Sequence, residues 1–417
     1  MSVRHGDRLR TRRRRHSAAM AGVLALGVIA AGCSSNPSDQ ASTRGGGGSS
    51  ASAGDSSPSA SAAPRSAATV ASNVKARGVQ VDKTLTLTAR DGTFKRVTVL
   101  AGKKGTLHGG LSSDKNTWTS KQRLEPGTRY RVTAVAVDSD GVATTKHSAF
   151  RTQPLSLDQQ TYPSFAPVEG STVGVGMPVI VRFDVPVSDK KAIEKHLSVT
   201  NSSGQKGAWR WISDSEVHWR PVHYWKPGTD VTVKADVNSI PAGNGVYGQL
   251  SRKSTFHVGD AVVSKVNAAT HQMKTFINGK LARTTPITTG KAGFTTRSGV
   301  KVIVEKFLSK RMNSETIGIA AGSSEAYDID NVQYAMRVTY SGEFLHAAPW
   351  SVGSQGSANV SHGCVGMSTE NAAWLYSLTK RGEVVDVTGT NRPMEPTNGY
   401  GDWNVSWPDY RAGSALH

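Results

Sequence analysis

The chain has almost no cysteine. Only Cys33 and Cys364 occur among its 417 residues, which excludes the framework of several disulfides that stabilises many small secreted domains. If Cys33 is used elsewhere, Cys364 has no partner and remains a lone thiol. On composition alone, a buried and inert cysteine is the ordinary reading of such a residue. In an oxidising compartment, however, an exposed free thiol is a liability unless it performs chemistry.

Acidic residues are also scarce. The chain has 31 Asp and Glu against 50 Lys and Arg, which gives a formal net charge of +19. This charge favours anionic surroundings, such as nucleic acid, lipid headgroups or acidic wall polymers, unless the lysines only aid solubility. We see no recognition motif for nucleic acid, so we do not expect that partner. No cluster of Cys, His and carboxylate residues has metal-ligand spacing, so the sequence implies no metal and no organic cofactor.

The N-terminal apolar run is too short to span a bilayer as a helix. It extends over residues 18–31 and follows the positive cluster at residues 12–15, which is typical of an export signal. Small residues before Cys33 resemble a bacterial lipobox, in which this cysteine is lipidated. We therefore expect residues 1–33 to be a lipoprotein signal peptide and the protein to be anchored to the outer face of the cell membrane, acting in the cell wall. An uncleaved anchor and plain secretion are the alternatives.

A linker and two repeated sections follow. Residues 34–74 are mostly Ser, Ala, Gly, Pro and Thr, which predicts a disordered linker. Trp118 and Trp219 each stand shortly before a Pro-Gly-Thr turn and an alternating strand, and the two turns lie about 100 residues apart. The repeat predicts two immunoglobulin-like β-sandwich domains, at residues 75–155 and 156–258. Neither section has a cluster of catalytic residue types, so we expect them to act as rigid spacers.

The next section, residues 259–392, is strand-rich as well. Asn278-Gly279 is a strong hairpin signal between predicted strands at 272–277 and 280–287. Further strands are predicted at 300–308 and 332–340. One main helix is expected to begin at the N-cap Ser368 and to end with Lys380 and Arg381 before a glycine. The predicted fold class is therefore mainly β, with two sandwiches followed by a β-rich domain that contains one main helix.

The residue types of cysteine catalysis gather in this section. Cys364 ends the sequence Ser361-His362-Gly363-Cys364, and His346 precedes it across a polar, glycine-rich loop. A cysteine nucleophile needs a base that removes its proton and backbone N–H groups that bind the oxyanion. His346 is the candidate base. Gly363 has no side chain, so the N–H groups near Cys364 can approach an oxyanion.

These residues resemble the YkuD-type L,D-transpeptidases, whose pattern is a histidine, fourteen to seventeen residues, and then Ser/Thr-His-Gly-Cys. Here the gap, residues 347–360, has fourteen. The resemblance covers roughly residues 260–410 and implies a catalytic domain at 259–392. It implies that a cysteine thioester forms 3→3 cross-links between peptidoglycan stem peptides, from a tetrapeptide donor to a diamino-acid amine. It also implies carbapenem inhibitors, and a C-terminal segment, residues 393–417, that packs on the catalytic domain behind tandem immunoglobulin-like domains of the actinobacterial type.

The same resemblance implies roles for further residues. The carbonyl of Ala347 would orient the base, while Tyr327 and Met312 would belong to a lid over the substrate. Other substrate-binding positions would be Ser341, Gly342, Ser361 and His362. Plainer readings are core filling for Met312, a simple turn for Ser341-Gly342, and structural hydrogen bonding for His362.

One position departs from the family pattern. Gly366 stands where the family has Asn or Arg, so any substrate contact made by that side chain is lost. Because glycine can be replaced unless its φ is positive, we expect asparagine to be tolerated there.

We also expect Cys364 to react with thiol reagents at pH 7 faster than a free peptide thiol.

Alternative functions stay open. An L,D-carboxypeptidase, or another cysteine hydrolase that remodels peptidoglycan, would use the same nucleophile with water as the acceptor. Papain-like endopeptidases usually place the cysteine before the histidine, whereas this chain has the histidine first. A non-catalytic wall-binding lipoprotein is the third possibility.

Overall fold

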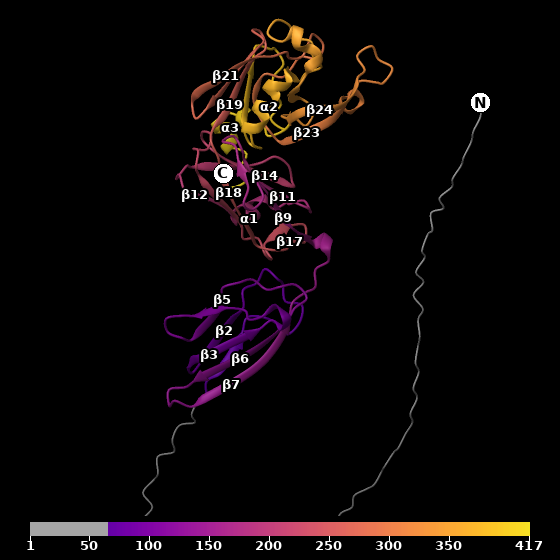
Figure 1. The fold of residues 1–417 in the computed structure, drawn as a ribbon. Helices are drawn as coiled ribbons and strands as arrows, with labels where there is room; N and C mark the ends of the chain where they lie inside the picture. Colours follow the sequence, from indigo (N-terminus) through magenta and orange to yellow (C-terminus); the bar gives the residue numbers. More distant parts are fainter. Residues whose placement is uncertain (1–65) are drawn as a thin grey trace, which may run out of the picture. The chain divides into compact units, whose positions relative to one another are not determined.

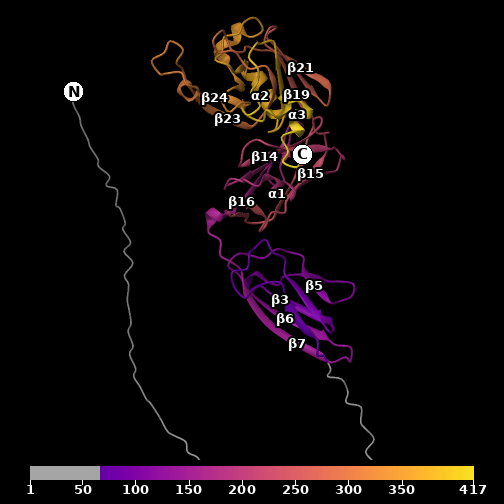
Figure 2. The same cartoon turned by 180° about the vertical axis from the view of Figure 1, so that it is seen from behind.

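β-Strands dominate the structure, a computed structural model that describes residues 66–417 (Figure 1; Figure 2 from behind). The predicted signal peptide, with its lipidation site Cys33, and most of the predicted linker lie outside these residues. No helix within residues 66–417 has the length and apolar character needed to cross a membrane.

The first domain is a sandwich of two sheets with strand orders β1-β2-β5-β4 and β3-β6-β7. Alternate residues of the strands point inward, and the core includes Leu87, Trp118 and Tyr130. The domain begins earlier than the predicted boundary at residue 75, because β1 pairs with β2 from Thr69 onward. The short edge strand β1 is held mainly by backbone hydrogen bonds, which do not depend on apolar side chains. Its Ser- and Ala-rich sequence therefore resembled that of the linker. The elements are β1 (Thr69–Ser72), β2 (Thr86–Arg90), β3 (Thr93–Leu100), η1 (Gly102–Lys104), β4 (Gly109–Leu111), β5 (Thr117–Ser120), β6 (Arg129–Val137) and β7 (Ala143–Arg151).

The second domain has sheets with strand orders β10-β18-β15-β12 and β13-β14-β11-β9, and a small third sheet, β16-β17-β8. Trp219 and Trp225 stack in its core with ring centroids 5.3 Å apart. Its elements are η2 (Leu157–Gln159), β8 (Gln160–Thr161), β9 (Pro163–Ala166), β10 (Thr172–Val173), β11 (Val179–Phe183), α1 (Lys190–Glu194), β12 (Leu197–Asn201), β13 (Gly207–Trp211), β14 (Glu216–Pro221), β15 (Asp230–Ala235), β16 (Pro241–Gly243), β17 (Val246–Gly248) and β18 (Arg252–Val258).

The third domain contains a five-stranded sheet, β21-β20-β19-β27-β22, and a four-stranded sheet, β23-β24-β25-β26. The Asn278-Gly279 hairpin is present, and both turn residues have positive φ, as a type I′ turn requires. The helix α2 packs against β24 and β25, and Ser368 caps it by accepting the N–H of Asn371. The elements are β19 (Val262–Asn267), β20 (Gln272–Ile277), β21 (Lys280–Pro286), β22 (Gly299–Val302), β23 (Glu305–Asn313), η3 (Ser314–Ile317), β24 (Asp328–Arg337), β25 (Phe344–Ala347), η4 (Pro349–Ser354), β26 (Val365–Met367), α2 (Thr369–Leu378) and β27 (Val384–Thr388).

Two predicted elements differ from the structure. The single strand predicted at 300–308 is two strands, β22 and β23, which belong to different sheets. Ile303 and Val304 lie between the two strands and are buried, so the apolar pattern continued through the break. The helix ends at Leu378, before the two basic residues expected in its last turn.

The C-terminal segment contacts both the second and third domains. It contains η5 (Asp402–Asn404) and α3 (Trp407–Arg411). The side chain of Asn404 accepts the N–H of Val300 in β22 at 2.8 Å. On the other side, Asp402 lies 2.9 Å from Nδ1 of His218. Burial opposes a charge on His218, but the nearby carboxylates outweigh burial and raise the pKa of His218 to about 9.

The second and third domains also share apolar packing. Val302, Val304 and Val384 of the third domain belong to the same buried cluster as Met177 and Trp225 of the second. The backbones approach closely, since a Cβ on Gly174 would lie 2.3 Å from the backbone nitrogen of Glu383. The two domains on either side of the boundary predicted near residue 258 therefore share a buried interface.

Candidate active site

The pairing of two short strands brings the candidate base next to the candidate nucleophile. β25 and β26 run parallel, and His346 is paired with Gly366. Cys364 directly precedes β26, so it enters the site from the neighbouring strand. The chain between the two strands folds into η4 and a glycine-rich loop.

His346 is held in one orientation. Its ring is buried, and Nδ1 lies 2.8 Å from the carbonyl oxygen of Ala347, so Nδ1 must carry the hydrogen. The ring also stacks with Trp350 at a centroid distance of 5.9 Å. Burial lowers the pKa of His346, and the hydrogen bond to Ala347 only partly offsets this. The ring is therefore neutral near pH 7, with Nε2 free to accept a proton.

Cys364 is a free and partly exposed thiol. Its Sγ donates to the carbonyl oxygen of Gly342 over 3.7 Å. Local desolvation raises the pKa of this thiol to about 12. With the pKa of His346 lowered and that of Cys364 raised, the resting site favours a neutral thiol beside a neutral imidazole. The raised pKa argues against the expectation that Cys364 reacts with thiol reagents at pH 7 faster than a free peptide thiol.

With this pKa, a small neutral reagent such as iodoacetamide is expected to modify Cys364 at pH 7 more slowly than it modifies a free peptide thiol. A pKa of about 12 leaves roughly 10⁻⁵ of the thiol ionised at pH 7. Because the thiolate fraction grows as the pH rises toward the pKa, the rate should rise continuously from pH 6 to pH 10. Intact-mass kinetics measure this rate, with the urea-unfolded protein as the control. A plateau below pH 8 would reveal a stored thiolate and imidazolium pair.

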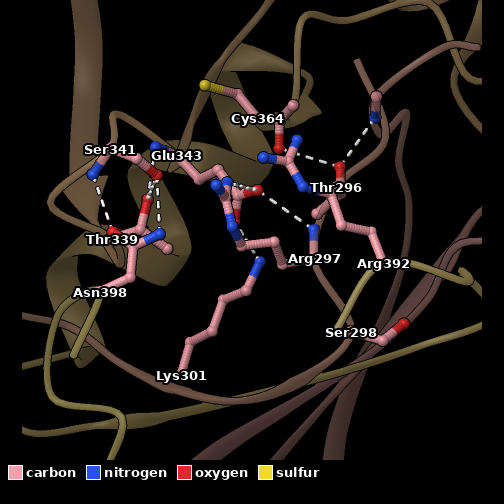
Figure 3. Close-up of polar contacts among 12 residues, drawn as sticks. Thr296, Arg297, Ser298, Lys301, Thr339, Ser341, Glu343, Cys364, Arg392 and Asn398 are labelled. Atoms are coloured by element: carbon pink, nitrogen blue, oxygen red, sulfur yellow. Dashed lines mark hydrogen bonds and ion pairs between the residues drawn. The ribbon is translucent and has the colours of Figure 1, made fainter. Parts of the chain in front are cut away.

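The loop before Cys364 is organised by Ser361. Its hydroxyl donates to the carbonyl oxygen of Cys364 at 2.7 Å and accepts the N–H of Gly363 at 3.1 Å. Gly363 has φ +119°, a conformation that favours glycine. Thr296 also donates to the carbonyl oxygen of Gly363, at 2.9 Å (Figure 3). The N–H of Gly363 is therefore already hydrogen-bonded to Ser361. The contribution of Gly363 to the site is the backbone conformation that it allows in this loop.

A cavity of about 280 Å³ opens over the nucleophile. Met312, Ile329 and Val332 contribute an apolar wall from β23 and β24, and burial raises the pKa of Tyr327, also in this wall, to about 12. Of the residues singled out in the sequence, seven line the cavity: Met312, Tyr327, His346, Ser361, His362, Cys364 and Gly366. Four do not: Ser341, Gly342, Ala347 and Gly363.

His362 lines the cavity and is also held by a charged pair. Its Nε2 lies 2.8 Å from a carboxylate oxygen of Glu325, and the same oxygen accepts from Lys291 at 2.5 Å. The ring contacts Phe294 and Tyr327 as well. Sequence reasoning missed Glu325 and Lys291, because single charged residues in loops carry no signal of long-range contact.

Ser341 and Gly342 form a turn beside the nucleophile instead of lining the cavity. Gly342 has φ +102°, and a Cβ there would lie 2.5 Å from the side chain of Ile317. The N–H of Ser341 donates to Asn398 at 2.9 Å. The structure therefore supports the turn, and connects it to Cys364 through the carbonyl of Gly342.

The surroundings of Gly366 contradict the expectation that asparagine is tolerated there. Its φ is not positive, but a Cβ would lie 2.9 Å from Thr288 and 3.0 Å from Ala348. We predict that Gly366→Asn lowers the free energy of unfolding by about 1–3 kcal/mol through overpacking, and slows acylation of Cys364. Urea unfolding and adduct kinetics measure the two effects. Gly353→Asn is the matched control, since that glycine has open space around it; equal stability of both variants would contradict the steric argument.

Within residues 66–417, no group of three or more His, Cys, Asp or Glu side chains is arranged to hold a metal ion. The chemistry of the site described above depends on the thiol, the imidazole and the surrounding backbone. Two β-sandwiches ahead of a β-rich domain with a thiol and an imidazole lining one cavity have the architecture of a cysteine enzyme with immunoglobulin-like domains.

Comparison with known proteins identifies the family. The bacterial Ig domain matches residues 76–241, and the L,D-transpeptidase catalytic domain, YkuD, matches residues 261–387. L,D-transpeptidase 2 of Mycobacterium tuberculosis is 36% identical over 81% of this chain and 82% of its own length. For L,D-transpeptidase 5 of the same organism, the identity is 34% over 78% of this chain and 72% of that protein. The chain belongs to the L,D-transpeptidase family.

A solved structure of a similar protein covers about half of this chain. It is the L,D-transpeptidase LdtMt1 in complex with imipenem, which is 36% identical, covers 54% of this chain and 97% of its own, and has a TM-score of 0.48.

Proposed function

We propose that this L,D-transpeptidase forms 3→3 cross-links between peptidoglycan stem peptides through a thioester on Cys364. The observation that carries the proposal is that Cys364, directly before β26, and His346, in the neighbouring strand β25, line one cavity, with Nδ1 of the imidazole fixed by Ala347. That arrangement leaves Nε2 of His346 as the proton acceptor for the thiol.

In the acylation half-reaction, Sγ of Cys364 attacks the carbonyl carbon of the third residue, a diamino acid, in the donor tetrapeptide. Nε2 of His346 takes the thiol proton as the S–C bond forms. The tetrahedral intermediate collapses, the C–N bond to the terminal D-Ala breaks, and His346 gives the proton to the leaving amine. A thioester remains on Cys364.

In the second half-reaction, the side-chain amine of another stem's diamino acid attacks the thioester. His346 accepts a proton from this amine, the C–S bond breaks, and the proton returns to Sγ. The two peptides are then joined and the enzyme is regenerated. Because the histidine begins and ends each half-reaction neutral, the low pKa of His346 suits this cycle.

The apolar wall of the cavity supports transfer to an amine over hydrolysis. Met312, Ile329 and Val332 face the same cavity as Cys364. A stem peptide lying against them would displace water from the thioester. The position of Met312 on the cavity wall supports a role for it at the substrate, beside the plainer role of filling the core.

For localisation we propose an extracytoplasmic enzyme that is anchored to the outer face of the membrane through lipid on Cys33. The proposal is supported by the basic and apolar pattern of residues 12–31 and the small residues before the cysteine. Metabolic labelling with a fatty acid tests it: the full-length chain should carry label and Cys33→Ser should not. Equal labelling of both proteins would exclude this anchor.

The reaction is tested by incubating residues 66–417 with a disaccharide-tetrapeptide and determining product masses. The expected product is a cross-linked dimer that has lost one D-Ala, and Cys364→Ala should form none. Release of D-Ala with only tripeptide product would instead indicate an L,D-carboxypeptidase. If neither product forms, the proposed substrate is wrong.

A further inference from the structure

The turn beside the nucleophile is tied to the C-terminal segment. Oδ1 of Asn398 accepts the N–H of Ser341 at 2.9 Å, and Nδ2 of Asn398 donates to the hydroxyl of Ser341 at 2.9 Å. Both groups of one amide side chain are therefore used on one residue of the turn (Figure 3). A two-point contact of this kind fixes the orientation of the turn as well as its distance.

Glu395 continues the connection toward the interior. Its Oε2 accepts from Nδ2 of Asn398 at 3.1 Å and from Nε of Arg297 at 2.5 Å. Arg297 then donates to Oε1 of Glu343 from both its backbone nitrogen and Nη1, each at 3.1 Å. Glu343 is the residue that follows the turn. The hydrogen bonds and the backbone thus close a ring: Asn398, Ser341, Gly342, Glu343, Arg297, Glu395 and back to Asn398.

The carbonyl group that accepts the hydrogen bond of the Cys364 thiol belongs to this ring. The carbonyl oxygen of Gly342 accepts from Sγ of Cys364 at 3.7 Å, and Gly342 lies between the two turn residues that the ring holds. Lys301 adds a buried ion pair to Glu343 on its other side (Figure 3). A shift of the turn would therefore move the carbonyl oxygen to which the thiol donates.

Little else outside the turn anchors Ser341. Its side chain is exposed, and its other hydrogen bond in the described residues is to Thr339, which belongs to the same turn. Gly342 has a left-handed φ of +102°, which the free chain has no reason to favour over other glycine conformations. Among the described residues, Asn398 therefore supplies the side-chain hydrogen bonds that hold Ser341 from outside the turn.

We propose that Asn398 and Glu395 are positioning residues for acyl transfer, which hold the Ser341-Gly342 turn so that the Gly342 carbonyl fixes the thiol of Cys364 for attack. The inference rests on the proposed role of Cys364 as the nucleophile, and it gives the C-terminal segment a part in the reaction. Neither residue touches the reacting atoms. Both act through the turn.

The first test replaces Asn398 with alanine in the protein spanning residues 66–417. A loosened turn misplaces the nucleophile, so kcat for cross-linking should fall by about 10- to 100-fold, while KM changes by less than about threefold. Iodoacetamide labelling of Cys364 at pH 9 should become faster by about 2- to 10-fold, because an acceptor that favours the protonated thiol is lost. Asn391→Ala is the matched control, since Asn391 is exposed in the same stretch and makes no side-chain hydrogen bond to other described residues; it should change neither rate.

The second test restores the ring with its polarity exchanged, in the double variant Glu395→Gln, Asn398→Asp. The carboxylate introduced at position 398 can accept the N–H of Ser341 and an N–H of the amide introduced at position 395. The oxygen of that amide can in turn accept from Arg297. This variant should regain most of the kcat and the slow labelling, with a melting temperature close to that of Asn398→Ala or above it. Unchanged kcat and labelling in Asn398→Ala would overturn the proposal, as would a double variant no better than the single one. Because labelling does not depend on peptidoglycan chemistry, it still tests the positioning role if the proposed cross-linking reaction fails.

Discussion

Incubation with a carbapenem is expected to add one drug mass per chain, at Cys364, and His346→Ala should slow this addition by about 10²–10⁴-fold. The strained β-lactam carbonyl can occupy the place of the donor's scissile carbonyl, so the same thiol attacks it. The large factor follows from the resting charge states. A thiol with a pKa of about 12 is not a nucleophile until a base takes its proton, and His346 is the base beside it.

Intact-protein mass spectrometry over time distinguishes the roles of the two residues. Cys364→Ala should form no adduct, whereas His346→Ala should form one slowly. His147→Ala is a suitable control, since this histidine is exposed on β7 of the first domain. An adduct on the Cys364→Ala protein, or a normal rate with His346→Ala, would show that the nucleophile or the base has been assigned incorrectly.

The second large effect concerns stability. Glu343→Gln is expected to lower the free energy of unfolding by about 3–5 kcal/mol, because it leaves the buried Lys301 without its carboxylate and leaves the buried Arg297 with Glu395 alone. The side chains of Arg297 and Lys301 are only 10% and 1% exposed, and both pair with Glu343. Urea unfolding at pH 7 measures the loss.

Glu305→Gln provides the comparison for this variant. Glu305 pairs with Arg337 in the same domain, but its side chain is 55% exposed. Removal of such a surface pair typically costs about 0–1 kcal/mol. If the two variants lose equal stability, the cost does not come from burial of the charges around Glu343.

The parts of the site that could be predicted are local in sequence. The loop around Cys364 is specified by Ser361 and Gly363, which lie within three residues of it, and the acceptor for His346 is its own neighbour Ala347. Contacts made across the fold gave no such signal. Glu325 holds His362 from the segment between η3 and β24, and Asn398 holds Ser341 from the C-terminal segment, yet neither stands in a recognisable pattern.

In the fold, too, features that are local in sequence could be predicted and long-range features could not. Hairpin and capping signals located β20, β21 and the start of α2, because each depends on neighbouring residues. The break between β22 and β23 was hidden, because both flanks and the link itself are apolar. The raised pKa of Cys364 could not be predicted for a related reason: the desolvation of the thiol is set by residues from several strands and cannot be read from the motif.

The packing between the second sandwich and the catalytic domain limits how this enzyme can be divided. Buried residues of the second sandwich pack against Val302, Val304 and Val384. A chain that begins at residue 259 would therefore expose an apolar surface that is otherwise shielded from water. Such a fragment would be prone to self-association. The second sandwich and the catalytic domain therefore form one packed unit, and we expect insertions that change the spacing to the anchor to be tolerated only upstream of residue 156.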